Sequence, residues 1–73
     1  MDAKLFGPRL REFREGAGLS QKELAEKMGV RQVTISAWEV GTRGPDLPML
    51  VKLAEFFGVT VNDFLEPAKR KKK

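Results

Sequence analysis

The side chains best suited to chemistry in this sequence are hydrogen-bond donors, and they gather between residues 20 and 43. They are Gln21, Arg31, Gln32, Thr34, Thr42 and Arg43. The chain has no His and no Cys. The hydroxyls of Ser20 and Ser36 therefore lack an imidazole to activate them, and thiolate metal sites and disulfides are excluded. We expect a protein that binds rather than catalyses and that uses no cofactor, no metal and no small-molecule ligand.

The basic charge of the chain lies at its C-terminus. The whole sequence has 14 Lys and Arg against 10 Asp and Glu, which gives a net charge of +4. Residues 69–73 carry five of these cations, so the remaining nine face ten acids and the rest of the chain has a net charge of −1. We expect residues 67–73 to form a disordered basic tail. Such a tail solubilises the protein, adds non-specific phosphate attraction or begins a linker.

Recurring capping signals predict a helical protein. Ser20 and Glu23 have the spacing of a capping box, and Thr60 and Asp63 repeat it. No segment shows the apolar alternation of a strand with flanking turn residues. We predict an all-α fold, a compact five-helix bundle. Its helices are expected near residues 5–16 (with Pro8 in the first turn), 20–28, 32–40 and 47–57 (capped by Asp46), with a short fifth helix around Phe64.

A three-residue turn separates the second and third predicted helices, at Gly29, Val30 and Arg31. Two short helices joined by a tight turn that contains Gly are typical of a helix-turn-helix. The expected core of this unit is Leu24, Ala25, Gly29, Val30, Ile35 and Trp38.

The segments LSQKELA (residues 19–25) and TISAWE (residues 34–39) resemble the helix-turn-helix family of the Cro and phage-repressor type, also called the XRE family. The resemblance continues through Pro45, Leu53 and Leu65, so it covers residues 5–66. It implies a DNA-binding domain at residues 1–66 and a cytoplasmic regulator of transcription, repressor-like and homodimeric, of prokaryotic or phage origin. Arg31 stands where the family often has a Ser or Thr cap.

The resemblance implies that the helix at residues 32–40 reads the major groove of double-stranded DNA. The side chains expected to read base edges are Gln32, Val33, Ser36 and Ala37. Those expected to contact phosphates are Gln21, Arg31, Thr34, Thr42, Arg43 and Arg14. For Arg14, a pair with an acid across the fold is the alternative.

Two points stay open in the sequence. A protein-interaction module, such as an antitoxin-like or sensor-binding partner, would use the same fold without binding DNA. The apolar stripe of Met49, Leu53 and Phe56 suits the core first and a dimer contact second. Phe56, Val61 and Leu65 are the candidate dimer contacts.

Overall fold

The computed structural model describes residues 3–66 of the protein, and within them every regular element is helical. The elements are α1 (Ala3–Gly16), α2 (Gln21–Met28), α3 (Gln32–Val40), α4 (Leu47–Phe57) and the 3₁₀-helix η1 (Val61–Leu65). The predicted all-α class is confirmed. The basic tail expected at residues 67–73 lies outside the described residues.

The count of five α-helices was wrong at the last element, which is a 3₁₀-helix of five residues. Short helical pieces commonly take the tighter 3₁₀ form. Glu66, which follows η1, is extended, with φ −97° and ψ 153°. It precedes Pro67, and a residue before proline is disfavoured in the α conformation. The proline therefore stops the helix before an α-helical turn is established.

The capping signals place the helix starts as predicted. The Glu23 backbone N–H donates to the Ser20 hydroxyl at 3.0 Å, and the Ser20 N–H donates to the Glu23 carboxylate at 2.8 Å. The carboxylate of Asp46 accepts from the Met49 N–H at 3.0 Å at the start of α4. Each cap satisfies a backbone donor that has no partner inside its helix.

Helix α1 begins earlier than predicted. It starts at Ala3, so Pro8 lies inside the helix rather than in its first turn. A proline removes one backbone hydrogen bond. That single loss did not prevent the turn before Pro8 from forming.

The core lies where α1 meets the other elements. Its buried apolar side chains are Phe6, Leu10, Leu24, Ala25, Met28, Ile35, Trp38, Leu50, Leu53, Ala54 and Phe64. Of the α4 stripe that sequence assigned to the core first, Leu53 is fully buried, Met49 packs against the core and Phe56 is 40% exposed. The stripe is thus mainly core, with one side chain at the surface.

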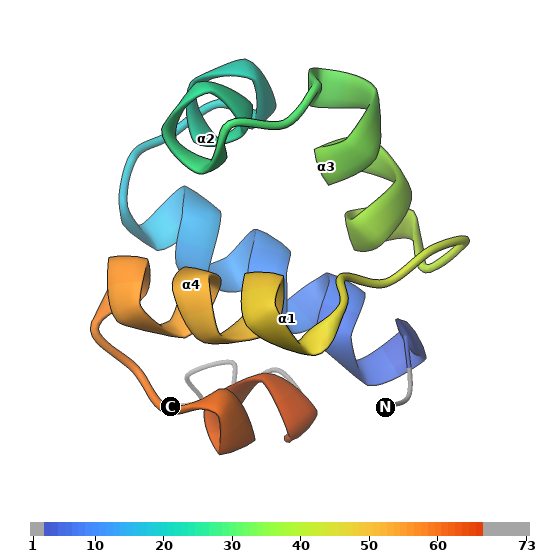
Figure 1. The fold of residues 1–73 in the computed structure, drawn as a ribbon, viewed down its shortest axis with the longest axis vertical. Helices are drawn as coiled ribbons and strands as arrows, with labels where there is room; N and C mark the ends of the chain where they lie inside the picture. The colour runs from blue at the N-terminus through green and yellow to red at the C-terminus, as the bar shows by residue number, and fades with distance from the viewer. Residues whose placement is uncertain (1–2, 67–73) are drawn as a thin grey trace, which may run out of the picture.

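Helix α1 positions α3 and η1. The helix pair α2 and α3 lies at one end of the molecule and η1 at the other (Figure 1). Arg9 joins α1 to η1, because its Nε donates to the Asp63 carbonyl at 2.7 Å. At Gly7, α1 passes so close to α3 that a Cβ would lie 2.4 Å from the Glu39 carbonyl oxygen and 2.8 Å from that of Trp38. This close approach sets the position of α3.

Candidate nucleic-acid interface

The turn between α2 and α3 holds the two helices against one core. Gly29 adopts a left-handed conformation with φ 74°, which suits glycine, and the Val30 N–H donates to the Ala25 carbonyl at 3.0 Å. Val30 packs against the core. The other members of the predicted unit, Leu24, Ala25, Ile35 and Trp38, are buried. Helix α3 is therefore held by its inner side, and its outer side is free to meet a ligand.

The start of α3 is exposed. Gln32 and Val33 both face solvent, and Val33 is 64% exposed. Ser36 and Ala37, one turn further on, are half-buried. Arg31 occupies the N-cap position without a side-chain capping bond, so its guanidinium is not used to begin the helix. Of the four expected base-reading residues, the first two in α3 are therefore exposed and the last two are half-buried.

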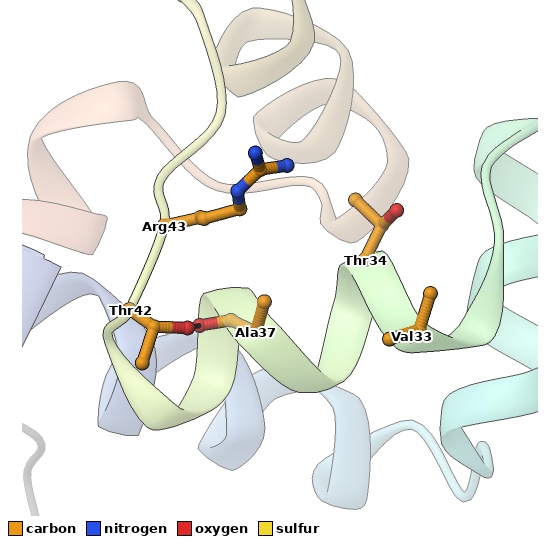
Figure 2. A pocket seen from close by; sticks show the side chains of 5 residues that line it. All are labelled: Val33, Thr34, Ala37, Thr42 and Arg43. Carbon is orange, nitrogen blue, oxygen red and sulfur yellow. Dashed lines mark hydrogen bonds between the residues drawn. The ribbon is translucent and has the colours of Figure 1, made fainter.

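A shallow hollow of about 390 Å³ lies between α3 and the loop that follows it. Val33, Thr34, Ala37, Thr42 and Arg43 line it (Figure 2). The Arg43 side chain extends from the loop toward Thr34, along the rim, while Val33 and Ala37 give apolar surface. Five residues expected to contact DNA, two at bases and three at phosphates, are therefore neighbours.

Backbone hydrogen bonds fix the loop that carries Arg43. The N–H groups of Gly41 and Thr42 donate to the Ala37 carbonyl at 2.9 and 3.1 Å, and the Thr42 hydroxyl donates to the same oxygen at 3.4 Å. Because this carbonyl belongs to the last turn of α3, the hydrogen bonds attach the loop to the end of the helix. The hydroxyl of Thr42 is already used in this contact, whereas Arg43 extends past it.

The cations of α1 and those near α3 differ in their partners. Arg9, Arg11 and Arg14 pair with Glu12, Glu15 and Glu39 respectively. No ion pair joins Arg31 or Arg43 to another residue within the described range 3–66. Unpaired positive charge is therefore present at the start of α3 and at the rim of the hollow, where an anion would be neutralised.

The structure places Arg14 in the interior, where it has an internal partner in place of the expected phosphate. The residue is 8% exposed. Its Nε and Nη2 donate to Glu39 at 2.6 and 3.2 Å, and its Nη1 donates to the Leu19 carbonyl at 2.7 Å. The hydrogen bond with Glu39 raises the pKa of Arg14, so the guanidinium stays charged. Helix α1 packs on α3 and thereby brings Arg14 next to Glu39. Without Arg14, Glu39 would be a buried charge with no cationic partner.

Gln21 is connected to the same pair. It opens α2 and is half-buried, and its side-chain Nε2 donates to Glu39 Oε1 at 3.1 Å. Sequence reasoning did not find Glu39. Its side chain is 5% exposed, yet no local pattern distinguishes it from a surface glutamate, since Arg14 lies 25 positions away in the chain.

Between residues 3 and 66 no group of three or more His, Cys, Asp and Glu side chains could hold a metal ion. No helix in this range is long and apolar enough to cross a membrane.

The sequence has relatives among transcriptional regulators. Residues 10–64 match the helix-turn-helix family. An uncharacterised HTH-type transcriptional regulator of Archaeoglobus fulgidus is 44% identical over 55 residues, which are 75% of this chain and 79% of the relative. The cryptic phage CTXphi transcriptional repressor RstR of Vibrio cholerae is 36% identical over 61 residues. The match covers 84% of this chain, which spans 55% of RstR.

The fold has relatives among solved structures as well. The BldD DNA-binding domain of S. venezulae is 34% identical, with a TM-score of 0.74, and the match covers 86% of this chain and 94% of that domain. The matched stretch at residues 10–64 contains α2, the turn, α3 and the loop that lines the hollow. This chain therefore belongs to the helix-turn-helix family.

Proposed function

We propose that this protein is a sequence-specific double-stranded DNA-binding regulator of transcription that inserts α3 into the major groove. The observation that carries the proposal is the hollow beside α3, which combines exposed apolar surface with an unpaired arginine. A major groove offers thymine methyl groups beside a phosphate backbone, which is the complementary chemistry. The names of the relatives support this, because RstR is a transcriptional repressor and the BldD domain binds DNA.

Base reading is assigned to the start of α3. The amide of Gln32 has the donor and acceptor that match N6 and N7 of adenine, and the methyl groups of Val33 suit a thymine methyl. Ser36 and Ala37 lie one turn deeper and are half-buried, so they contribute short-range contacts. The recognition helix would thus read base pairs mainly with its first residues.

Phosphate contacts are assigned to the donors around that helix. Arg31 and Arg43 supply charge, and Thr34 supplies a hydroxyl group at the hollow. Thr42 would contact a phosphate by turning its hydroxyl away from the Ala37 carbonyl. Gln21 supplies an amide from the first turn of α2, where the helix dipole also favours an anion. Contacts of this kind fix the orientation of a protein on DNA and make its affinity depend on salt.

The working protein is proposed to be a homodimer in the cytoplasm, bound to a two-fold site. One recognition helix reads few base pairs, and two half-sites a helical turn apart multiply the specificity. Of the candidate dimer contacts, Phe56 and Leu65 are 40% and 36% exposed, whereas Val61 packs against the core. Sedimentation of the wild type and of Phe56→Ser over a range of concentrations tests the dimer.

The test of DNA binding begins with selection of bound duplexes from a random pool. Gln32→Ala should reduce discrimination at one base pair by about 1–3 kcal/mol. Arg43→Ala should weaken binding to all sequences alike and lower the salt slope by about 1. Arg11→Ala is the matched control, because its side chain is 65% exposed and its loss changes the net charge equally.

Arg11→Ala should leave binding nearly unchanged. The proposal is wrong if no duplex is bound at low salt, or if binding depends only on residues 69–73 and is insensitive to Gln32 and Arg43. Recovery of a single protein partner together with absence of duplex binding would instead favour a protein-interaction module.

A further inference from the structure

The buried carboxylate of Glu39 connects three helices. It lies in α3 and accepts from Arg14 of α1 at 2.6 and 3.2 Å and from Gln21 of α2 at 3.1 Å. The Glu39 side chain is 5% exposed and that of Arg14 is 10% exposed. Glu39 therefore cannot meet DNA itself, yet it contacts a side chain that reaches the surface.

The chemistry of the contact fixes the orientation of the Gln21 amide. A carboxylate only accepts hydrogen bonds, so the group of Gln21 that faces Glu39 must be its NH₂. One N–H of that group is used by Glu39, and the second remains. Phosphate oxygens also only accept, so the remaining N–H has the polarity that a phosphate needs.

We propose that Glu39, held by Arg14, is a positioning residue for the DNA contact of Gln21, because it fixes the Gln21 amide with one N–H free for a phosphate oxygen. This inference rests on the proposed function. A free glutamine side chain has several rotamers, and ordering it at an interface lowers affinity. Glu39 orders it before DNA arrives, so the benefit appears in binding rather than only in folding.

Arg14 is necessary to this arrangement. A buried carboxylate without a cationic partner is strongly destabilising. The guanidinium neutralises Glu39 and occupies both of its oxygens, which leaves Oε1 shared with Gln21. The pair thereby holds the first turn of α2 at a set distance from α3.

A double-mutant cycle separates positioning from simple stabilisation. The background is Arg14→Met with Glu39→Met, since replacing a buried ion pair by apolar side chains of similar size often preserves the fold. Gln21→Ala is then made in the wild type and in this background, and the affinity for the selected duplex is measured for all four proteins. Thermal melting followed by circular dichroism confirms that each is folded.

Gln21→Ala should weaken binding about tenfold in the wild type and less than about twofold in the double-Met background. The double-Met variant alone should show most of the tenfold loss. An equal loss from Gln21→Ala in both backgrounds overturns the proposal, because it would make Glu39 a purely structural residue. If the wild type binds no duplex, the proposed function fails and the inference falls with it.

A second measurement needs no variant. The chain contains only three side-chain amides, those of Gln21, Gln32 and Asn62, so their NMR signals are separable. In the free protein the Gln21 NH₂ should be ordered and shifted, whereas that of Gln32 should be mobile. Addition of the selected duplex should shift the Gln21 signals further. A Gln21 amide as mobile as that of Gln32 in the free protein would overturn the proposal even if the double-Met variant fails to fold.

Discussion

The two sides of α3 satisfy their polar groups in opposite ways. On the inner side, the carboxylate of Glu39 accepts from Arg14 and Gln21 and is almost fully buried. On the outer side, Val33 is 64% exposed, and Arg43 has no carboxylate partner within residues 3–66. One helix therefore carries a completed set of contacts toward the core and an incomplete set toward solvent. We infer that the inner side sets stability and that the outer side is kept for a ligand.

The largest expected effect is at the inner side. Arg14→Met leaves the Glu39 carboxylate buried without a cationic partner, which should lower the free energy of unfolding by about 3–5 kcal/mol. A domain of this size has little more than that, so the variant should be close to unfolded. Urea denaturation measures the free energy of unfolding of this variant. The double variant with Glu39→Met should regain most of the loss, and a single variant as stable as the wild type would contradict the comparison.

Gly7 tests how tightly α1 supports α3. Gly7→Ala places a Cβ against the Glu39 carbonyl, which is backbone and cannot rotate away, so we expect a loss of about 2 kcal/mol in unfolding free energy. Gly16→Ala is the matched control, because it lies in the same helix with nothing within 4 Å. It should change stability by less than about 1 kcal/mol. Similar losses in both variants would show that close approach is not the cause.

On the outer side, Val33→Ala should alter binding and leave stability unchanged. Losing two methyl groups from a contact with a thymine methyl should weaken binding to the selected duplex about 15-fold, at about 0.8 kcal/mol for each buried group. Replacing the half-site thymines by deoxyuridine should weaken the wild type similarly and the variant much less, as fluorescence anisotropy would measure. A clear shift of the unfolding midpoint by Val33→Ala would show that the outer side of α3 also contributes to stability, against the comparison.

The smallest effect concerns the start of α2, which carries Gln21. Hydrogen bonds from the backbone N–H and then the hydroxyl of Ser20 lower the pKa of Glu23. The folded state therefore favours the charged form. Its contribution to stability is present above the ordinary glutamate pKa and is lost as pH falls through the lower pKa of the folded protein.

Glu23→Gln should accordingly flatten the acid side of the stability curve, measured by urea denaturation at several pH values. Glu26→Gln, in the same helix but outside the capping box, is the control and should leave the acid slope nearly as it is in the wild type. A slope unchanged by Glu23→Gln would show that the capping box does not contribute through its charge.

Local signals allowed most of the fold to be predicted. Ser20 bonds to Glu23, and Thr60 bonds to Asp63, each three positions further along the chain. Such local contacts can be predicted from the order of neighbouring residues. The type of the last helix was missed, because the proline after Glu66 keeps the helix to five residues and a piece that short takes the tighter 3₁₀ form. Sequence also placed Val33, Ala37 and Arg43 on one functional surface, and the structure brings them into one hollow.

What could not be predicted were long-range partners. Arg14 and Glu39 are each ordinary in their local context, and only the packing of α1 on α3 brings them within 2.6 Å. An arginine judged by its charge alone is expected at the surface, which is why Arg14 was predicted to contact a phosphate. The alternative of a pair across the fold was available from sequence, but the acid was not identifiable.

The most direct test of the account is an NMR titration of the full chain with the selected duplex, following the backbone amide signals. We expect the largest shifts at Gln32, Val33, Ala37, Thr42 and Arg43, with a second group at the start of α2. Shifts confined to α4 and η1, or to residues 69–73, with α3 unchanged, would contradict it.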